Sequence, residues 1–204
     1  MTLVVAAGAG SRTGQLVAAI ARRRGHRVRA LAALDDPAAV AEAVRDARAI
    51  VLIPQRGDAE RHAHGAVRAL TIAAREHSPA AHLLLVSSFA AGQPAHPLNR
   101  VTAGLPGRLA AERALRASGL AWTVLRPTWL TDDPPGAHAV SVTQDPRADG
   151  MLARVDLAAA LVAAAEHPLA RGKTFALFNE PGEPPRDWAP VFAALAPDPE
   201  AAPA

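Results

Sequence analysis

The sequence predicts an α/β fold, a doubly wound parallel sheet of about six strands with helices on both faces. Short apolar runs without polar alternation, typical of strands buried on both sides, alternate with helical segments along the chain. The first run leads into a glycine-rich turn and a helix, "LVVAAGAGSRTGQLVAAI", over residues 3–20. A chain of 204 residues that is 50% apolar is long enough for one domain of this kind.

Each predicted strand is a short apolar run bounded by turn residues. The expected strands cover residues 2–7, 27–32, 49–54, 82–88, 121–127 and 174–179. In a parallel sheet of this type, ligands bind beyond the carboxyl ends of the strands. The loops after residues 7, 32, 54, 88 and 127 are therefore expected to converge on one cleft.

The predicted helices follow from apolar spacing and end signals. Leu16, Val17 and Ile20 mark one face of the first helix, and Gly25 ends it. Asp36 is the expected N-cap of the second, with proline at its first position. The remaining helices are expected at 58–77 with Asp58 as a candidate cap, at 106–117, at 156–166 capped by Asp156, and at 187–195 capped by Asp187.

Two polar segments interrupt this alternation. Residues 89–104 are predicted to be a loop broken by glycine and proline. Residues 131–150 are expected to be irregular, with one short strand, and to form a small lid over the substrate. We expect one domain over residues 1–196 and a disordered tail over 197–204.

Composition excludes several classes of site. The chain has no cysteine, so it has neither a thiolate metal site nor a cysteine nucleophile, and no metal site is predicted. The formal net charge is only +3, and the dense arginine cluster at 22–29 is expected at the sheet edge opposite the cleft. Neither nucleic acid nor a membrane is an expected partner, and a cytoplasmic location is expected because no basic leader or long apolar run is present.

Four segments together resemble a known family. They read "AAGAGSRTGQLV", "LLLVSSFAAG", "AERALRASGLAWTVLRPTWL" and "ARVDLAAALVAAAEHP". They are similar to the atypical short-chain dehydrogenase/reductase superfamily, in particular to its small NAD(P)H-binding, NmrA-like group. The resemblance extends over about residues 2–180 and implies a Rossmann-like fold that binds NADP or NAD.

The glycine turn departs from the family pattern G-A-T-G-x-x-G. Gly8 and Gly14 match its first and last glycines, Gly10 replaces the threonine, and Ser11 replaces the middle glycine. Ser11 places a Cβ where the backbone approaches the pyrophosphate, and we expect it to strain the turn. The helix N-terminus with Arg12 and Thr13 still offers an anion site. The alternative is a tight turn that binds no cofactor.

The type of cofactor is left open by a second departure. Ala33 stands where the resemblance implies an arginine for the 2′-phosphate of NADP. Asp35, 21 residues after Gly14, is placed to accept from a ribose hydroxyl, although it is also typical of a turn. The resemblance assigns the rest of the cofactor site to Pro54, Gln55, Pro127 and Thr128.

The usual catalytic pair is absent. The chain has no tyrosine, and Gly104 and Arg108 stand where the family has Tyr-x-x-x-Lys. Ser88 matches the family's serine, and Arg108 is a candidate for binding a phosphate or carboxylate, since arginine holds its proton near neutral pH. His96 is a candidate acid or base, with an exposed loop histidine as the alternative.

The substrate end of the cleft is assigned to Trp129, Leu130 and Asp132. A large aromatic residue at a cleft lip suits a planar substrate, although Trp129 also suits a core position. Asp132 lies in "TDDPPG", which is also an ordinary turn sequence. Arg154 is interpreted as an ion-pair partner of Asp156.

Three functions fit these observations. The first is an NAD(P)H-dependent reductase that acts on a small planar or carbonyl substrate. The second is a non-redox enzyme on the same scaffold, such as a cyclase, isomerase or dehydratase. The third is a nucleotide-sensing regulator. The expected partners are a small-molecule substrate and a second copy of the chain in a homodimer.

Overall fold

The architecture is a single central sheet between two layers of helices. A computed structural model describes residues 1–6, 8–54, 62–93, 95–98 and 104–199. Seven strands form the sheet in the order β2-β1-β3-β4-β5-β9-β7. All neighbours from β2 to β9 are parallel, and only β7 is antiparallel to its neighbour. The predicted Rossmann-like, doubly wound sheet with six parallel strands is confirmed, and β7 is added at one edge.

The parallel strands lie within two residues of their predicted ranges. They are β1 (Thr2–Ala6), β2 (Arg27–Leu31), β3 (Ala49–Leu52), β4 (His82–Val86), β5 (Ala121–Pro127) and β9 (Lys173–Glu180). Every residue of β3 and β4 is buried. Successive side chains enter opposite cores, as Ile50 and Val51 do, which explains why these strands read as unbroken apolar runs.

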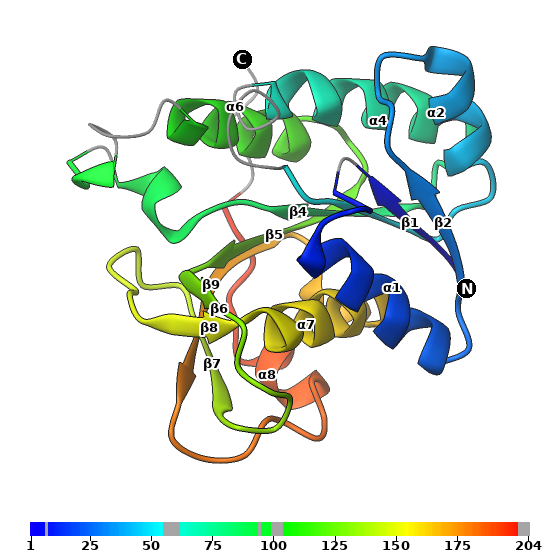
Figure 1. Ribbon diagram of the computed structural model, residues 1–204. Coiled ribbons are helices and arrows are strands. Elements are labelled where there is room, and N and C mark those ends of the chain that lie inside the picture. Colours follow the sequence, from blue (N-terminus) through cyan, green and yellow to red (C-terminus); the bar gives the residue numbers. More distant parts are fainter. Residues whose placement is uncertain (7, 55–61, 94, 99–103, 200–204) are drawn as a thin grey trace.

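The helices cover both faces of the sheet, as Figure 1 shows. One face carries α1 (Arg12–Arg23), α7 (Arg154–Glu166) and α8 (Ala189–Ala193), and the other carries α2 (Pro37–Val44), α4 (Ala63–His77) and α6 (Gly104–Arg116). Asp36 caps α2 as predicted, because its carboxylate accepts the amides of Ala38 and Ala39. Among the described residues, no helix combines the length and apolar character needed to cross a membrane.

Three helix starts differ from their predictions. Helix α7 begins at Arg154, so Asp156 lies in its first turn and is not the N-cap. Helix α6 already includes Gly104 and Leu105, because a proline is tolerated in the first turn, where its missing N–H would have no intrahelical acceptor. Helix α8 begins at Ala189 with Trp188 as its N-cap, although the carboxylate of the predicted cap Asp187 accepts the Ala189 amide at 2.9 Å. The expected cap Asp58 of the helix predicted at 58–77 lies outside the described residues.

The segment expected to be irregular contains more regular structure than predicted. Strand β6 (Trp129–Thr131) pairs in parallel with β8 (Met151–Ala153), and β7 (Ala139–Thr143) extends the main sheet beside β9. Short 3₁₀ helices, η1 (Phe89–Gly92) and η2 (Pro168–Ala170), follow β4 and α7. Strand β7 forms because β9 offers an unpaired edge, which the sequence of residues 131–150 does not reveal.

The chain also packs further than expected at its end. Asp198 lies in the segment predicted to be a disordered tail. Its carboxylate accepts the Thr174 amide at 2.8 Å and the Arg116 Nε at 3.2 Å. Asp198 is therefore ordered although disorder was predicted from residue 197, because its carboxylate binds Arg116 of α6.

Candidate functional site

The glycine-rich turn joins β1 to α1 through hydrogen bonds of its own. The Ser11 amide and hydroxyl both donate to the Gly8 carbonyl, at 2.9 and 2.7 Å. The Ser11 hydroxyl also accepts the Gly14 amide at 3.0 Å, which makes Ser11 the N-cap of α1. A Cβ on Gly14 would lie 2.0 Å from the Gly8 carbonyl oxygen, so only glycine fits there. A Cβ on Gly10, in contrast, would meet nothing within 4 Å.

The expected strain at Ser11 is absent. Its φ is −74° and its ψ is 160°, an extended conformation that any residue adopts. Ser11 acts differently from the prediction, because its hydroxyl takes the Gly14 amide, one of the donors that a bound phosphate would use. The amides of Arg12 and Thr13 have no acceptor within the described part of the chain. The turn therefore fits a pyrophosphate with two amides and the Arg12 guanidinium.

Asp132 lies between two arginines that come from different helices. Arg12 Nη1 donates to Oδ2 at 2.5 Å, and Arg154 Nε donates to Oδ1 at 2.8 Å. The hydrogen bond from Arg154 and the charge of Arg12 lower the pKa of Asp132, so its carboxylate is ionised at neutral pH. The predicted phosphate ligand and the predicted substrate ligand thus bind each other, and the predicted pairing of Arg154 with Asp156 is wrong.

Ser88 follows β4 and stands next to an aromatic cluster. Its half-buried hydroxyl accepts the Ala90 amide at 3.4 Å. The neighbouring Phe89 ring contacts the His96 and Trp129 rings edge-on, with centroids 5.3 and 5.5 Å apart. The Trp129 side chain is 38% exposed, and its Nε1 donates to Asp149 at 3.0 Å. The aromatic cluster of Phe89, His96 and Trp129 thus holds a partly exposed indole against Phe89, the residue that follows Ser88.

His96 has a defined tautomer in its neutral form. Its Nδ1 accepts the Leu98 amide at 3.2 Å, so the proton of the neutral ring lies on Nε2. A histidine in this state donates from Nε2 and does not accept there. This arrangement suits a hydrogen-bond donor at Nε2, and a catalytic role for His96 stays a prediction.

Arg108 is bound to backbone carbonyls, and its predicted catalytic role stays a prediction. Its guanidinium is buried and donates to the carbonyls of Val86 and Ser87, both at 2.9 Å, and of Pro54 at 3.2 Å. These carbonyls lie at the ends of β4 and β3, where the strands give way to loops. Arg108 therefore ties together the two strand ends that carry the predicted site.

Glu112, one turn further along α6, was missed by the sequence analysis. It is 0% exposed and accepts the Ser87 hydroxyl at 2.5 Å. Arg126 binds it through Nε at 3.0 Å and Nη2 at 2.7 Å, and Arg116 through Nη2 at 3.2 Å. A carboxylate on a buried helix face, with an arginine in the next strand, is a signal that could have found this ion pair, because buried charges occur paired.

The remaining predicted cofactor residues that the structure describes, and the predicted substrate residue Leu130, lie at or after the ends of β2 and β5. Asp35 is exposed in the turn after β2, and Gln55 lies outside the described residues. The Thr128 amide and hydroxyl both donate to the Leu177 carbonyl, at 3.2 and 3.0 Å, which fixes the end of β5 against β9. Pro127 is buried in β5, and Leu130 packs partly buried against the core. No contact of these residues tests their predicted roles.

Asn179 connects the predicted lid to α7. Its Nδ2 donates to Asp156 at 2.8 Å and to the Ala139 carbonyl at 3.0 Å, and its Oδ1 accepts the Ala153 amide at 2.6 Å. Burial raises the pKa of Asp156, although the hydrogen bond from Asn179 opposes this shift. One side chain of β9 therefore anchors both β7 and the start of α7.

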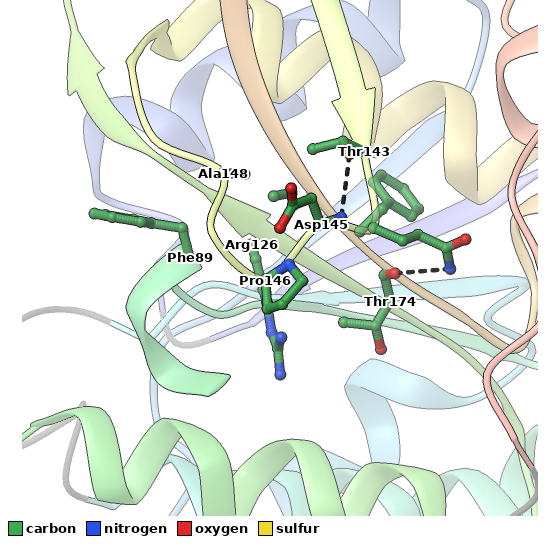
Figure 2. A pocket seen from close by; sticks show the side chains of 10 residues that line it. Phe89, Arg126, Thr143, Asp145, Pro146, Ala148 and Thr174 are labelled. Atoms are coloured by element: carbon green, nitrogen blue, oxygen red, sulfur yellow. Dashed lines mark hydrogen bonds between the residues drawn. The ribbon is translucent and has the colours of Figure 1, made fainter. Parts of the chain in front are cut away.

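A shallow hollow that is open to solvent lies on the α6 side of the sheet between Phe89 and the loop after β7. Figure 2 shows Arg126 and Asp145 in its lining. Arg126 is paired with Glu112, and Asp145 with Arg147. Its charged lining is thus already neutralised within the chain, and we assign it no part in the cofactor site.

A comparison with known families decides the kind of protein. Residues 31–168, more than half of the chain, match the family model described as NAD(P)H-binding. The chain belongs to the NAD(P)H-binding family. The matched range begins after the glycine turn, so the fit of residues 8–14 to a nicotinamide dinucleotide rests on the geometry of the turn itself.

Three known proteins resemble the chain to different extents. Sanguinarine reductase of Eschscholzia californica is 32% identical over 121 residues, which are 55% of this chain and 44% of the plant protein. The chain thus covers less than half the length of that relative. A putative NAD-dependent epimerase/dehydratase from Bacillus halodurans shares the fold with a TM-score of 0.77, 19% identity and coverage of 95% and 99% of the two chains. ChuY, an anaerobillin reductase from Escherichia coli O157:H7, gives a TM-score of 0.74, 19% identity and coverage of 89% and 100%.

Proposed function

We propose that this protein is an NAD(P)H-dependent reductase that acts on a small planar or carbonyl substrate. The observation that carries the proposal is the contact of the partly exposed Trp129 indole with Phe89, the residue that follows Ser88, at the same sheet edge as the glycine turn. Membership of the NAD(P)H-binding family supports the cofactor. The names of sanguinarine reductase and of ChuY support the reaction class.

Each residue of this edge has a distinct role. The amides of Arg12 and Thr13 would bind the pyrophosphate at the start of α1. Bound NAD(P)H supplies a hydride from C4 of its nicotinamide. The Ser88 hydroxyl orients the acceptor oxygen of the substrate, and the Trp129 indole stacks on a planar ring system. The proton would come from water, or from His96 when both of its ring nitrogens carry a proton, because the chain has no tyrosine and Arg108 is bound to carbonyls.

A titration tests the proposal directly. Purified protein is titrated with NADH and with NADPH, and binding is followed by nicotinamide fluorescence. We expect saturation with a Kd below roughly 100 μM for at least one of them. Oxidation of the bound cofactor by quinones, flavins or enones then identifies the substrate class. A lack of saturation at millimolar concentrations would rule out the reductase.

One observation favours a second candidate. Because Ser11 takes the Gly14 amide, the turn satisfies part of its own anion site. A non-redox enzyme, such as a cyclase, isomerase or dehydratase, would tolerate this loss. The variant Ser11→Gly separates the two: for a reductase it should tighten cofactor binding by releasing the Gly14 amide, and for a non-redox enzyme it should change nothing.

A further inference from the structure

We propose that Asp132 is an internal competitor for the cofactor's phosphate groups at Arg12, and that it is held against α1 until a phosphate takes its place. This inference rests on the proposed function, since it concerns the same cofactor. It adds a specificity-determining residue that the glycine turn itself does not contain. Asp132 follows β6 and reaches back over 120 residues to the start of α1.

The chemistry of the contact supports competition. A guanidinium binds carboxylate and phosphate oxygens in the same way, through charged N–H groups that donate to anionic oxygens. Arg12 is the first residue of α1, directly after the Ser11 cap, where the open amides of Arg12 and Thr13 face an incoming anion. An anion bound at these amides lies within reach of the same guanidinium that now binds Asp132.

The two arginines hold Asp132 unequally. The Arg12 side chain is 76% exposed, whereas that of Arg154 is 27% exposed. An exposed ion pair is weak because water and salt screen it, so the bond to Arg12 is the one that a doubly charged phosphate can replace. Asp132 then keeps its hydrogen bond to Arg154 on α7 and loses only the one to Arg12 on α1.

The neighbouring charges do not replace Asp132 in this contact. Asp133 accepts the Thr131 hydroxyl at 2.7 Å and lies 3.7 Å from His138 Nε2, so it is directed toward its own segment. Strand β6 ends just before Asp132 and carries Trp129 at its other end. Exchange at Arg12 therefore acts on the strand that presents the proposed stacking surface.

The variant Asp132→Asn tests this competition. We expect it to tighten binding of the dinucleotide by about twofold to fivefold, the range that follows from the worth of an exposed ion pair. Asp145→Asn removes the same charge from an exposed, singly paired aspartate of the same segment and should leave the affinity unchanged. An equal gain for NADH and NADPH identifies the pyrophosphate as the competing group, and a gain for NADPH alone identifies the 2′-phosphate.

A double variant isolates the contact with Arg12. In the Arg12→Gln background, Asp132→Asn should bring no gain, because the competed group is absent. Addition of inorganic pyrophosphate to the wild type should also raise amide hydrogen exchange in residues 132–138. An unchanged or weaker affinity in Asp132→Asn, or a gain that persists without Arg12, overturns the inference while the reductase proposal stands. If neither NADH, NADPH nor pyrophosphate binds to any variant, both proposals fail.

Discussion

Gly14→Ala is predicted to destabilise the protein through a single added carbon. The new Cβ would lie 2.0 Å from the Gly8 carbonyl oxygen, 2.8 Å from its carbon and 3.0 Å from the Cα of Ala9. All three atoms belong to the backbone, so no side chain can rotate away. Restoring an ordinary contact of 3.4 Å requires the turn to move by about 1.4 Å. The Gly8 carbonyl also accepts both bonds from Ser11, so this movement disrupts the cap of α1.

The magnitude follows from these losses. Overpacking costs about 1–3 kcal/mol, and each disrupted hydrogen bond costs about 1 kcal/mol. The better helix propensity of alanine offsets about 1 kcal/mol. We therefore expect the free energy of unfolding to fall by about 2–4 kcal/mol, a large part of the roughly 5–15 kcal/mol of an ordinary domain. Urea unfolding followed by circular dichroism measures this change.

Gly10→Ala is the matched control in the same turn. A Cβ there meets nothing within 4 Å, and Gly10 does not have a positive φ. Its free energy of unfolding should stay within about 0.5 kcal/mol of the wild type, or rise slightly because the unfolded chain loses entropy. A Gly14→Ala variant as stable as the wild type, or an equal loss in Gly10→Ala, would refute the packing of the turn described above.

Three further predictions concern buried ionisable groups. Glu112→Gln should lower the free energy of unfolding by about 3 kcal/mol, because it leaves two arginines without their carboxylate. The control Glu42→Gln changes an exposed glutamate and should alter the free energy of unfolding by less than about 0.5 kcal/mol. Similar losses for the two variants in urea unfolding would contradict the role of Glu112. Burial lowers the pKa of His82 from 6.5 to about 4, so the unfolded chain takes up a proton at a higher pH than the folded chain. Acidification between these two values should therefore lower the stability of the wild type by up to about 3 kcal/mol, and His82→Gln should not show this loss. Equal acid sensitivity of wild type and variant in thermal melts would show this attribution to be mistaken. Burial raises the pKa of Asp156 above 3.8, so the folded state binds the proton more tightly, and stability falls as pH rises through the folded pKa. Asp156→Asn keeps an amide oxygen that can accept from Asn179, so it should melt at a higher temperature than the wild type at neutral pH. This gain should disappear near pH 3.8, and a gain that is independent of pH would contradict the role of the Asp156 charge.

The sequence by itself determined the layout of the sheet, the glycine turn and the cap of α2. These features depend on short-range rules: an apolar run buried on both faces, an aspartate before a helix, and a glycine where two backbone segments meet. Gly14 is an example, because the residue that its Cβ would meet, Gly8, belongs to the same short turn of the sequence. The six parallel strands were predictable for the same reason, since each is defined by its own residues.

Only the tertiary structure decided what the charged side chains do. Arg12 and Asp132 are 120 residues apart in the sequence, and Glu112 of α6 forms an ion pair with Arg126 of the following strand, β5. The family resemblance made Arg108 a candidate for catalysis, and only the fold shows that its guanidinium donates to carbonyls that follow β3 and end β4. A long charged side chain can reach in many directions, and its partner is set by which strand ends and helix starts the fold brings together. The edge strand β7 arose in the same way, because its partner β9 is fixed by the whole sheet and not by residues 139–143.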